Sequence, residues 1–361
     1  MRKFFLVIFC SFFFIRCEKE FSVIEEKEQN SYRDVSTIKT PWNHSNYFIP
    51  FEMNGQIFAI DRIGKGSFSD KYHLNVFDNT NQKWTYITQF DWSEDLISSV
   101  VGLNDKIIIV SGNKFGVFSF DGNEMKKGFT EQYWSNSQRD FIYAIADSNS
   151  YVVFDESGFA HYGNASSSYI SSPNKKYIGA IFNYYVDIEG VNYAVSENGL
   201  YVSGLGITSW SKILSPKENK IFLGIFNYKG SYAIAEYNDT SQYVNILAYE
   251  NGGDIPTDTL GTFYEDFSWG SQSGQHKFMQ MYYENDLFIG FTGQFDNSSW
   301  DKGTRYTGKA FASENLGVKE IKEAKGSVLG DALSYPLMYN GKLYFVDSYY
   351  STHKLVELTF D

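Results

Sequence analysis

Short runs of apolar and aromatic residues alternate along this chain with two-residue polar turns. Each turn lies between runs that are rich in β-branched and aromatic residues, such as Gln56-Ile57-Phe58-Ala59-Ile60. These runs are too short and too continuous for surface helices, so they predict strands joined by tight hairpins. The turns are Asn54-Gly55, Asn104-Asp105, Ser148-Asn149, Glu189-Gly190, Lys229-Gly230, Asn285-Asp286 and Asn340-Gly341. All seven contain Gly, Asn or Asp, which tolerate the positive φ that a two-residue hairpin needs.

The spacing of these turns predicts the architecture. Their second residues are 50, 44, 41, 40, 56 and 55 residues apart. A hairpin that recurs at such intervals is typical of a β-propeller, which has one four-stranded blade per repeat. The aromatic content of 19% suits sheets packed face to face. We therefore predict an all-β propeller, with an irregular all-β sandwich as the alternative.

The pattern assigns seven blades, the last of them incomplete. The expected blades are about 46–92, 97–135, 141–171, 177–214, 221–262, 276–323 and 334–361. The last supplies three evident strands, Tyr335–Tyr339, Lys342–Asp347 and Lys354–Phe360. We expect a segment near Asp34–Thr40 to supply the fourth strand, which would close the ring and remove an exposed edge. A ring that stays open and a six-bladed ring are the alternatives.

The N-terminus resembles that of a bacterial lipoprotein. Arg2 and Lys3 precede an apolar run, Phe4–Ile15, which is too short to span a bilayer. Cys17 follows that run and is followed by polar residues. The resemblance implies a signal peptide at 1–16, a lipidated Cys17 with a polar tether at 17–45, and a propeller at 46–361. The expected location is the outer membrane or cell surface; a secreted protein and an uncleaved anchor are the alternatives.

Two further resemblances lie inside the repeats. Asn75–Trp84, in which Phe77 and Trp84 flank a polar turn, resembles a kelch blade. Asn198–Ile213 and Ser299–Tyr306 resemble sialidase-type Asp-box repeats. Both repeat types are found in propellers, and Asp boxes are structural turns rather than catalytic groups. The resemblances therefore support the fold and leave the function open.

Composition excludes several functions. The net charge of −12 makes nucleic acid an unlikely partner, and the membrane would be contacted through the lipid alone. The five His residues lack metal-ligand spacing and no Cys follows Cys17, so we expect no metal site and no cofactor. The sequence also lacks the arginine cluster that a sialidase needs to hold a carboxylate.

Long connections predict the functional face. In a propeller, the connections after the second and the fourth strand of each blade emerge on one face. We expect the turns on the other face to be short throughout, because nearly all of the loop length lies in five connections of the first kind, 62–71, 88–96, 130–140, 261–275 and 292–308. We expect the face with the long connections to bind a ligand through aromatic and polar side chains. The alternative is that the tryptophans among them pack between blades. The candidates are Trp92, Trp134, Trp269, Trp300, Arg139, Tyr264, Asp266 and Arg305.

The sequence thus predicts a monomeric binding or scaffold propeller that recognises a glycan or an envelope protein. Aromatic rings beside carboxylates and amides suit sugars, because C–H faces stack on rings while hydroxyls form hydrogen bonds. A carbohydrate-active enzyme (a hydrolase, lyase or epimerase) on the same face is the alternative, and no catalytic pair is identifiable. A purely structural role in an envelope assembly is the third hypothesis.

Overall fold

A computed structural model of the chain confirms an all-β propeller, and no helix occurs in the part of the chain that it describes. That part comprises residues 30–39, 48–62, 71–81, 83–92, 97, 99–132, 141–146, 150–155, 158–164, 174–178, 180, 182, 184–203, 207, 209–250, 253–267, 276–296, 304–323, 337–339, 342–349 and 352–360. In several of these strands only the backbone is described.

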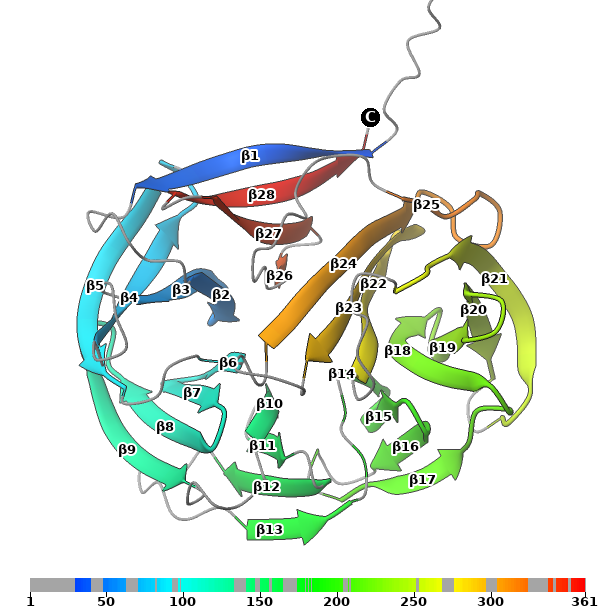
Figure 1. The fold of residues 1–361 in the computed structure, drawn as a ribbon, viewed down its shortest axis with the longest axis horizontal. Helices are drawn as coiled ribbons and strands as arrows, with labels where there is room; N and C mark the ends of the chain where they lie inside the picture. Colours follow the sequence, from blue (N-terminus) through cyan, green and yellow to red (C-terminus); the bar gives the residue numbers. More distant parts are fainter. Residues whose placement is uncertain are drawn as a thin grey trace, which may run out of the picture.

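The described strands form seven four-stranded antiparallel sheets around a common centre, and each sheet is one blade (Figure 1). Blades one to three consist of β2 (Phe48–Met53), β3 (Gln56–Arg62), β4 (Lys71–Asp78) and β5 (Lys83–Asp91); β6 (Ser99–Leu103), β7 (Lys106–Ser111), β8 (Lys114–Phe120) and β9 (Met125–Gln132); and β10 (Phe141–Ala146), β11 (Ser150–Asp155), β12 (Phe159–Asn164) and β13 (Asn174–Tyr177).

Blades four to six consist of β14 (Tyr184–Ile188), β15 (Val191–Ser196), β16 (Gly199–Ser203) and β17 (Ser211–Leu214); β18 (Lys220–Tyr228), β19 (Ser231–Asn238), β20 (Tyr243–Tyr249) and β21 (Pro256–Tyr264); and β22 (His276–Glu284), β23 (Leu287–Asp296), β24 (Thr304–Ser313) and β25 (Lys322–Glu323). Blade seven consists of β26 (Leu337–Tyr339), β27 (Lys342–Tyr349), β28 (Thr352–Phe360) and β1 (Asn30–Lys39).

The predicted closure by an N-terminal strand is confirmed. β1 lies along β28 as the outermost strand of blade seven, and its register pairs Asn30 with Phe360 and Lys39 with Thr352 (Figure 1). The strand begins four residues before the predicted segment, so part of the expected tether belongs to the ring. At the seam with blade one, the Tyr339 hydroxyl donates a hydrogen bond to the carbonyl oxygen of Gly55 at 2.7 Å.

The hairpin turns have the predicted backbone conformation. Asn54, Asn104, Glu189, Lys229 and Asn285 all have φ between 51° and 54°. The turns at Ser148-Asn149 and Asn340-Gly341 lie outside the described residues. The boundary between blades three and four was wrong: the fourth strand of blade three is β13, beyond the predicted end at 171, and blade four begins at β14.

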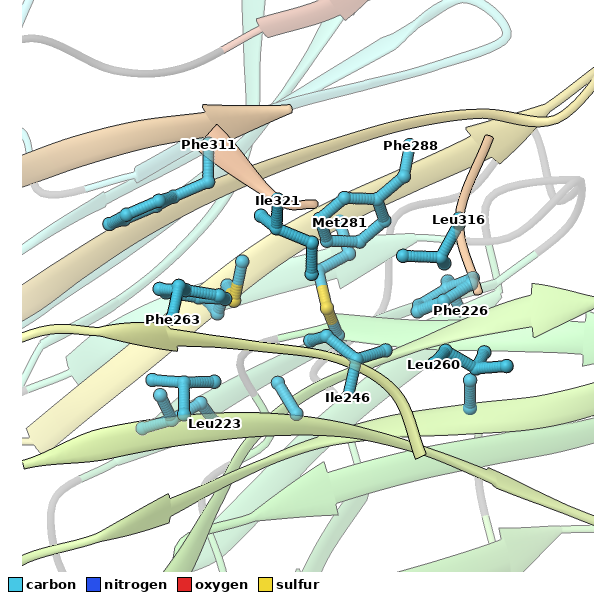
Figure 2. Packing of buried hydrophobic residues seen from close by; sticks show 14 of the residues in the cluster. Leu223, Phe226, Ile246, Leu260, Phe263, Met281, Phe288, Phe311, Leu316 and Ile321 are labelled. Atoms are coloured by element: carbon cyan, nitrogen blue, oxygen red, sulfur yellow. The ribbon is translucent and has the colours of Figure 1, made fainter. Parts of the chain in front are cut away.

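Neighbouring blades approach closely where a glycine of one blade faces the backbone of the next. A Cβ atom on Gly224 of β18 would lie 2.0 Å from the carbonyl oxygen of Met279 in β22. Figure 2 shows the core between blades five and six, where Phe263, Phe311 and Ile321 interlock. Leu316 and Ile321, in the segment that leads to β25, are buried against blade five. The interface between blades five and six is thus filled by side chains of both sheets.

The two faces of the ring follow from strand direction. We call the side where second strands end and third strands begin the long-loop face, and the opposite side the short-turn face. The five long connections named in the sequence analysis all leave from the long-loop face. The short-turn face is not limited to short connections, contrary to prediction, because those from Asn164 to Asn174 and from Ser313 to Lys322 leave from it.

Candidate functional site

A polar residue recurs at the sixth position after every hairpin turn, where the second strand of each blade reaches the long-loop face. This repeat was not among the predicted features, although it is visible in the amino-acid sequence. All but the last have described side chains, and each of those is at most 5% exposed. The residues are Asp61, Ser111, Asp155, Ser196, Glu236, Thr292 and Asp347.

Buried partners satisfy most of these groups. The Asp61 carboxylate lies 3.3 Å from His73 Nδ1, and Glu236 Oε1 accepts a hydrogen bond from Lys220 Nζ at 2.6 Å. Asp155 accepts a hydrogen bond from the backbone N–H of Phe159 at 3.0 Å. Because a buried polar group without a partner is costly, these contacts fix the base of the long-loop face.

At blades five and six, Glu265 is fully buried just after β21 ends. It accepts hydrogen bonds from the Thr292 hydroxyl at 2.8 Å and from the backbone N–H of Phe267 at 3.2 Å. Burial raises the pKa of Glu265 above the ordinary carboxyl value, and the two hydrogen bonds oppose that rise. Phe267 has a φ of 43°, so the chain leaves β21 in a defined left-handed bend.

Lys277, in β22 of blade six, contacts both Tyr237 of blade five and Phe267 in the bend after β21. Its ammonium group lies 2.6 Å from Asp239 Oδ1 and 4.6 Å from the centre of the Tyr237 ring. Its backbone N–H donates to Glu197 Oε1 at 2.7 Å, which connects blade six to the turn of blade four. The Tyr237 and Phe267 rings meet edge to face at 5.0 Å. Burial raises the pKa of Tyr237 to about 12, and the nearby carboxylates add to the rise.

Two of the predicted site residues, Tyr264 and Asp266, lie beside these contacts. Tyr264 is 46% exposed at the end of β21, and Asp266 is half-buried beside Glu265 and Phe267. Tyr264 is the register partner of Tyr243, whose ring centre lies 5.6 Å away. Tyr243 is also exposed, although the sequence analysis did not select it.

The expectation of an exposed Trp92 was wrong. Its side chain is 2% exposed, and its Nε1–H donates to the Ser111 hydroxyl at 2.9 Å. Gly116 and Phe118 pack against the ring, and Lys114 Nζ lies 4.6 Å from its centre. Trp92 therefore belongs to the core, in agreement with the packing alternative.

The remaining candidates are not brought together by the described geometry. Trp134, Trp269, Trp300 and Arg139 lie outside the described residues, as does Cys17. Arg305 lies in β24, where the backbone alone is described. Tyr264 and Asp266 are thus the two predicted residues whose side chains the structure places at this face.

The arrangement places one aromatic and one carboxylate side chain on a supported framework at the long-loop face. Ion pairs, aromatic contacts and a buried carboxylate hold the backbone at Tyr264 and Asp266 in position, and the Tyr264 side chain is still 46% exposed. Within the described ranges, no group of three His, Cys, Asp or Glu side chains is placed to hold a metal ion. Nor does any helix there have the length and apolarity to cross a membrane.

No protein-family model matches this sequence, and a comparison with curated proteins finds no relative. Solved structures are similar in fold. A chain of Saccharomyces cerevisiae Sqt1 has a TM-score of 0.54 at 10% identity, covering 91% of this chain and 99% of its own. A chain in the crystal structure of the mitotic checkpoint complex has a TM-score of 0.56 at 8% identity, covering 91% and 92%. At such identities the likeness shows the fold alone, a β-propeller.

Proposed function

We propose that this chain is an extracytoplasmic, lipid-anchored binding propeller that recognises a glycan or an envelope protein through its long-loop face. The observation that carries the proposal is the exposed Tyr264 on the buried framework of Glu265, Phe267 and Lys277. A preorganised aromatic side chain contributes contact area at little entropic cost on binding. The similar chain in the mitotic checkpoint complex belongs to an assembly, which is consistent with a propeller used for binding.

The anchor is proposed from the sequence around Cys17. Asn30, the first residue of β1, lies at the short-turn face. A lipid on Cys17 therefore turns the short-turn face toward the membrane and leaves the long-loop face free. Replacing Cys17 with Ser is expected to move the protein from the membrane to the soluble fraction. Unchanged membrane association of Cys17→Ser contradicts a lipid anchor.

The binding face is tested by ligand capture followed by hydrogen exchange. A soluble form that begins at Glu18 is screened on a glycan array and used to capture proteins from an envelope extract. We expect the bound ligand to slow exchange at residues 237–242 and 264–267. The control is the short-turn face, where 54–55 and 229–230 should exchange unchanged. Protection confined to the short-turn face would disprove the assignment of the long-loop face.

A further inference from the structure

Two exposed tyrosines, two amide side chains and one threonine form a row on the outer strands of blade five. The register of β20 and β21 pairs Tyr243 with Tyr264, and Asn245 with Thr262. Alternate residues of a strand point to the same side of its sheet, so both pairs share one side. Gln242 lies in the turn immediately before β20. We call these five residues the rim strip.

Hydrogen bonds inside the rim strip orient its polar groups. The Tyr264 hydroxyl donates to Gln242 Oε1 at 2.6 Å, and the Thr262 hydroxyl donates to Asn245 Oδ1 at 2.8 Å. Each amide oxygen is thereby used within the strip, while each amide NH₂ group carries two donors. Among the residues that the structure describes, neither NH₂ group has a hydrogen-bond acceptor. These donors are available to a ligand.

The two tyrosine rings provide flat apolar surfaces beside those donors. Tyr243 is 45% exposed and Tyr264 is 46% exposed, and their planes meet at 76°. The backbone under the rings is fixed, because the N–H of Glu265 donates to the carbonyl oxygen of Gln242 at 2.9 Å. A ligand therefore meets surfaces that are already ordered.

The chemistry of the strip matches a neutral sugar. Pyranose rings have an apolar C–H face that packs on an aromatic ring, and hydroxyl oxygens that accept hydrogen bonds from amide donors. No member of the strip is charged, and the chain as a whole carries −12, which disfavours anionic ligands. A stable protein interface buries about 800 Å² on each partner, far more than five side chains supply. The strip is therefore better suited to one or two sugar rings than to a folded protein.

We propose that the rim strip is a subsite for the neutral pyranose units of a glycan. This inference rests on the proposed binding function and specifies its ligand class. Tyr243 and Tyr264 stack against the sugar rings, and Gln242 and Asn245 donate hydrogen bonds to the hydroxyl oxygens. Binding through this strip requires no metal and no covalent step.

Blade three supplies a matched control. Tyr177 ends β13 as Tyr264 ends β21, and its ring lies 5.1 Å from its register partner Phe159. It is 63% exposed, so it is at least as accessible as the strip tyrosines. The next register pair on that side is His161 with Lys175, which lacks the Asn–Thr arrangement. Tyr177→Ala therefore removes an exposed rim tyrosine without affecting the proposed subsite.

The test is isothermal titration of the soluble form that begins at Glu18 with neutral hexasaccharides. The probes are cellohexaose, maltohexaose, chitohexaose and mannohexaose, with an anionic hexagalacturonate as a contrast. We expect at least one neutral probe to bind, and Tyr264→Ala to weaken that binding roughly tenfold or more. Asn245→Ala is expected to weaken it several-fold, and Tyr177→Ala to leave it unchanged. Unchanged thermal melts confirm that each variant is folded.

Three results would overturn the proposal: no neutral probe binds folded protein at millimolar concentration, Tyr264→Ala binds as tightly as the original chain, or hexagalacturonate binds more tightly than every neutral probe. The hydrogen-exchange experiment distinguishes failure of the sugar subsite from failure of the proposed binding function. A captured envelope protein that protects 237–242 and 264–267, with no sugar binding, supports a binding face and rejects the sugar subsite. No ligand by either route rejects both.

Discussion

At the scale of residues, hydrogen bonds between buried side chains make the base of the long-loop face rigid. Trp92, just after β5, donates to Ser111 of β7, and Glu265, just after β21, accepts from Thr292 of β23. Ser111 and Thr292 both belong to the repeat of polar residues in the second strands. A change at either residue should therefore affect stability and leave other blades intact.

Trp92→Phe is expected to destabilise the protein by roughly 2–4 kcal/mol, because it removes ring volume and leaves the buried Ser111 hydroxyl without its donor. The free energy of unfolding in urea measures the effect. Tyr177→Phe, at an exposed site, should change it by less than about 0.5 kcal/mol. A stable Trp92→Phe protein that loses ligand binding would instead restore Trp92 as a contact residue.

Glu265→Gln is expected to remove a loss of folding stability that occurs when the buried Glu265 carboxyl group ionises. Because burial raises the pKa of Glu265 in the folded state, the folded protein binds this proton more tightly than the unfolded chain does. The stability associated with this group is therefore fully present below the ordinary carboxyl pKa of about 4.3 and is lost as the pH rises through the raised pKa. The melting temperature of the original chain should fall relative to Glu265→Gln over that interval. A difference that is constant with pH would show that Glu265 does not titrate as inferred.

At the scale of elements, contact between adjacent inner strands depends on glycine. β18 has a register irregularity between Phe222 and Gly224, and β22 approaches at that point. Gly102 has the same role in β6, where a Cβ atom would lie 2.6 Å from the carbonyl oxygen of Glu52 in β2. Inner strands therefore pack backbone against backbone at these positions.

Gly224→Ala is expected to cost more than roughly 2 kcal/mol, because the added methyl group meets backbone that cannot rotate away. Gly122→Ala provides the comparison: its φ is +96° and no atom lies within 4 Å of the added Cβ. That change should cost about 1–2 kcal/mol through backbone conformation alone. Urea unfolding of both variants separates the two causes, and a smaller cost for Gly224→Ala would contradict the steric explanation.

At the scale of the whole molecule, stability depends on closing the ring. β1 and β28 join the two ends of the described chain in one blade, so the last sheet acquires its fourth strand only when both are present (Figure 1). Without β1, the outer edge of β28 would present unpaired backbone groups, which favours association between chains.

A chain that begins at Thr40 is therefore expected to melt at a lower temperature and to form oligomers, whereas one that begins at Gln29 should stay monomeric. Size-exclusion chromatography and thermal melts measure both effects. Equal behaviour of the two shortened chains would show that closure by β1 is dispensable.

The sequence by itself determined the hairpins, the blade count and the closing strand. Asn54-Gly55 and Lys229-Gly230 predict turns because positive φ is a local property of the backbone. The repeat interval predicts blades because each blade is built from consecutive strands. Local chemistry and short-range order were sufficient for these features.

Only the tertiary structure decided which aromatics are exposed. Trp92 and Tyr264 both stand at the ends of fourth strands, yet one packs against Gly116 and the other faces outward. The contact of Lys277 with Glu197 joins residues 80 positions apart. Burial depends on the size of the side chains that the neighbouring blade presents, and register irregularities such as that between Ile246 and Leu247 set which residues meet. Neither quantity is local, so neither follows from the sequence pattern.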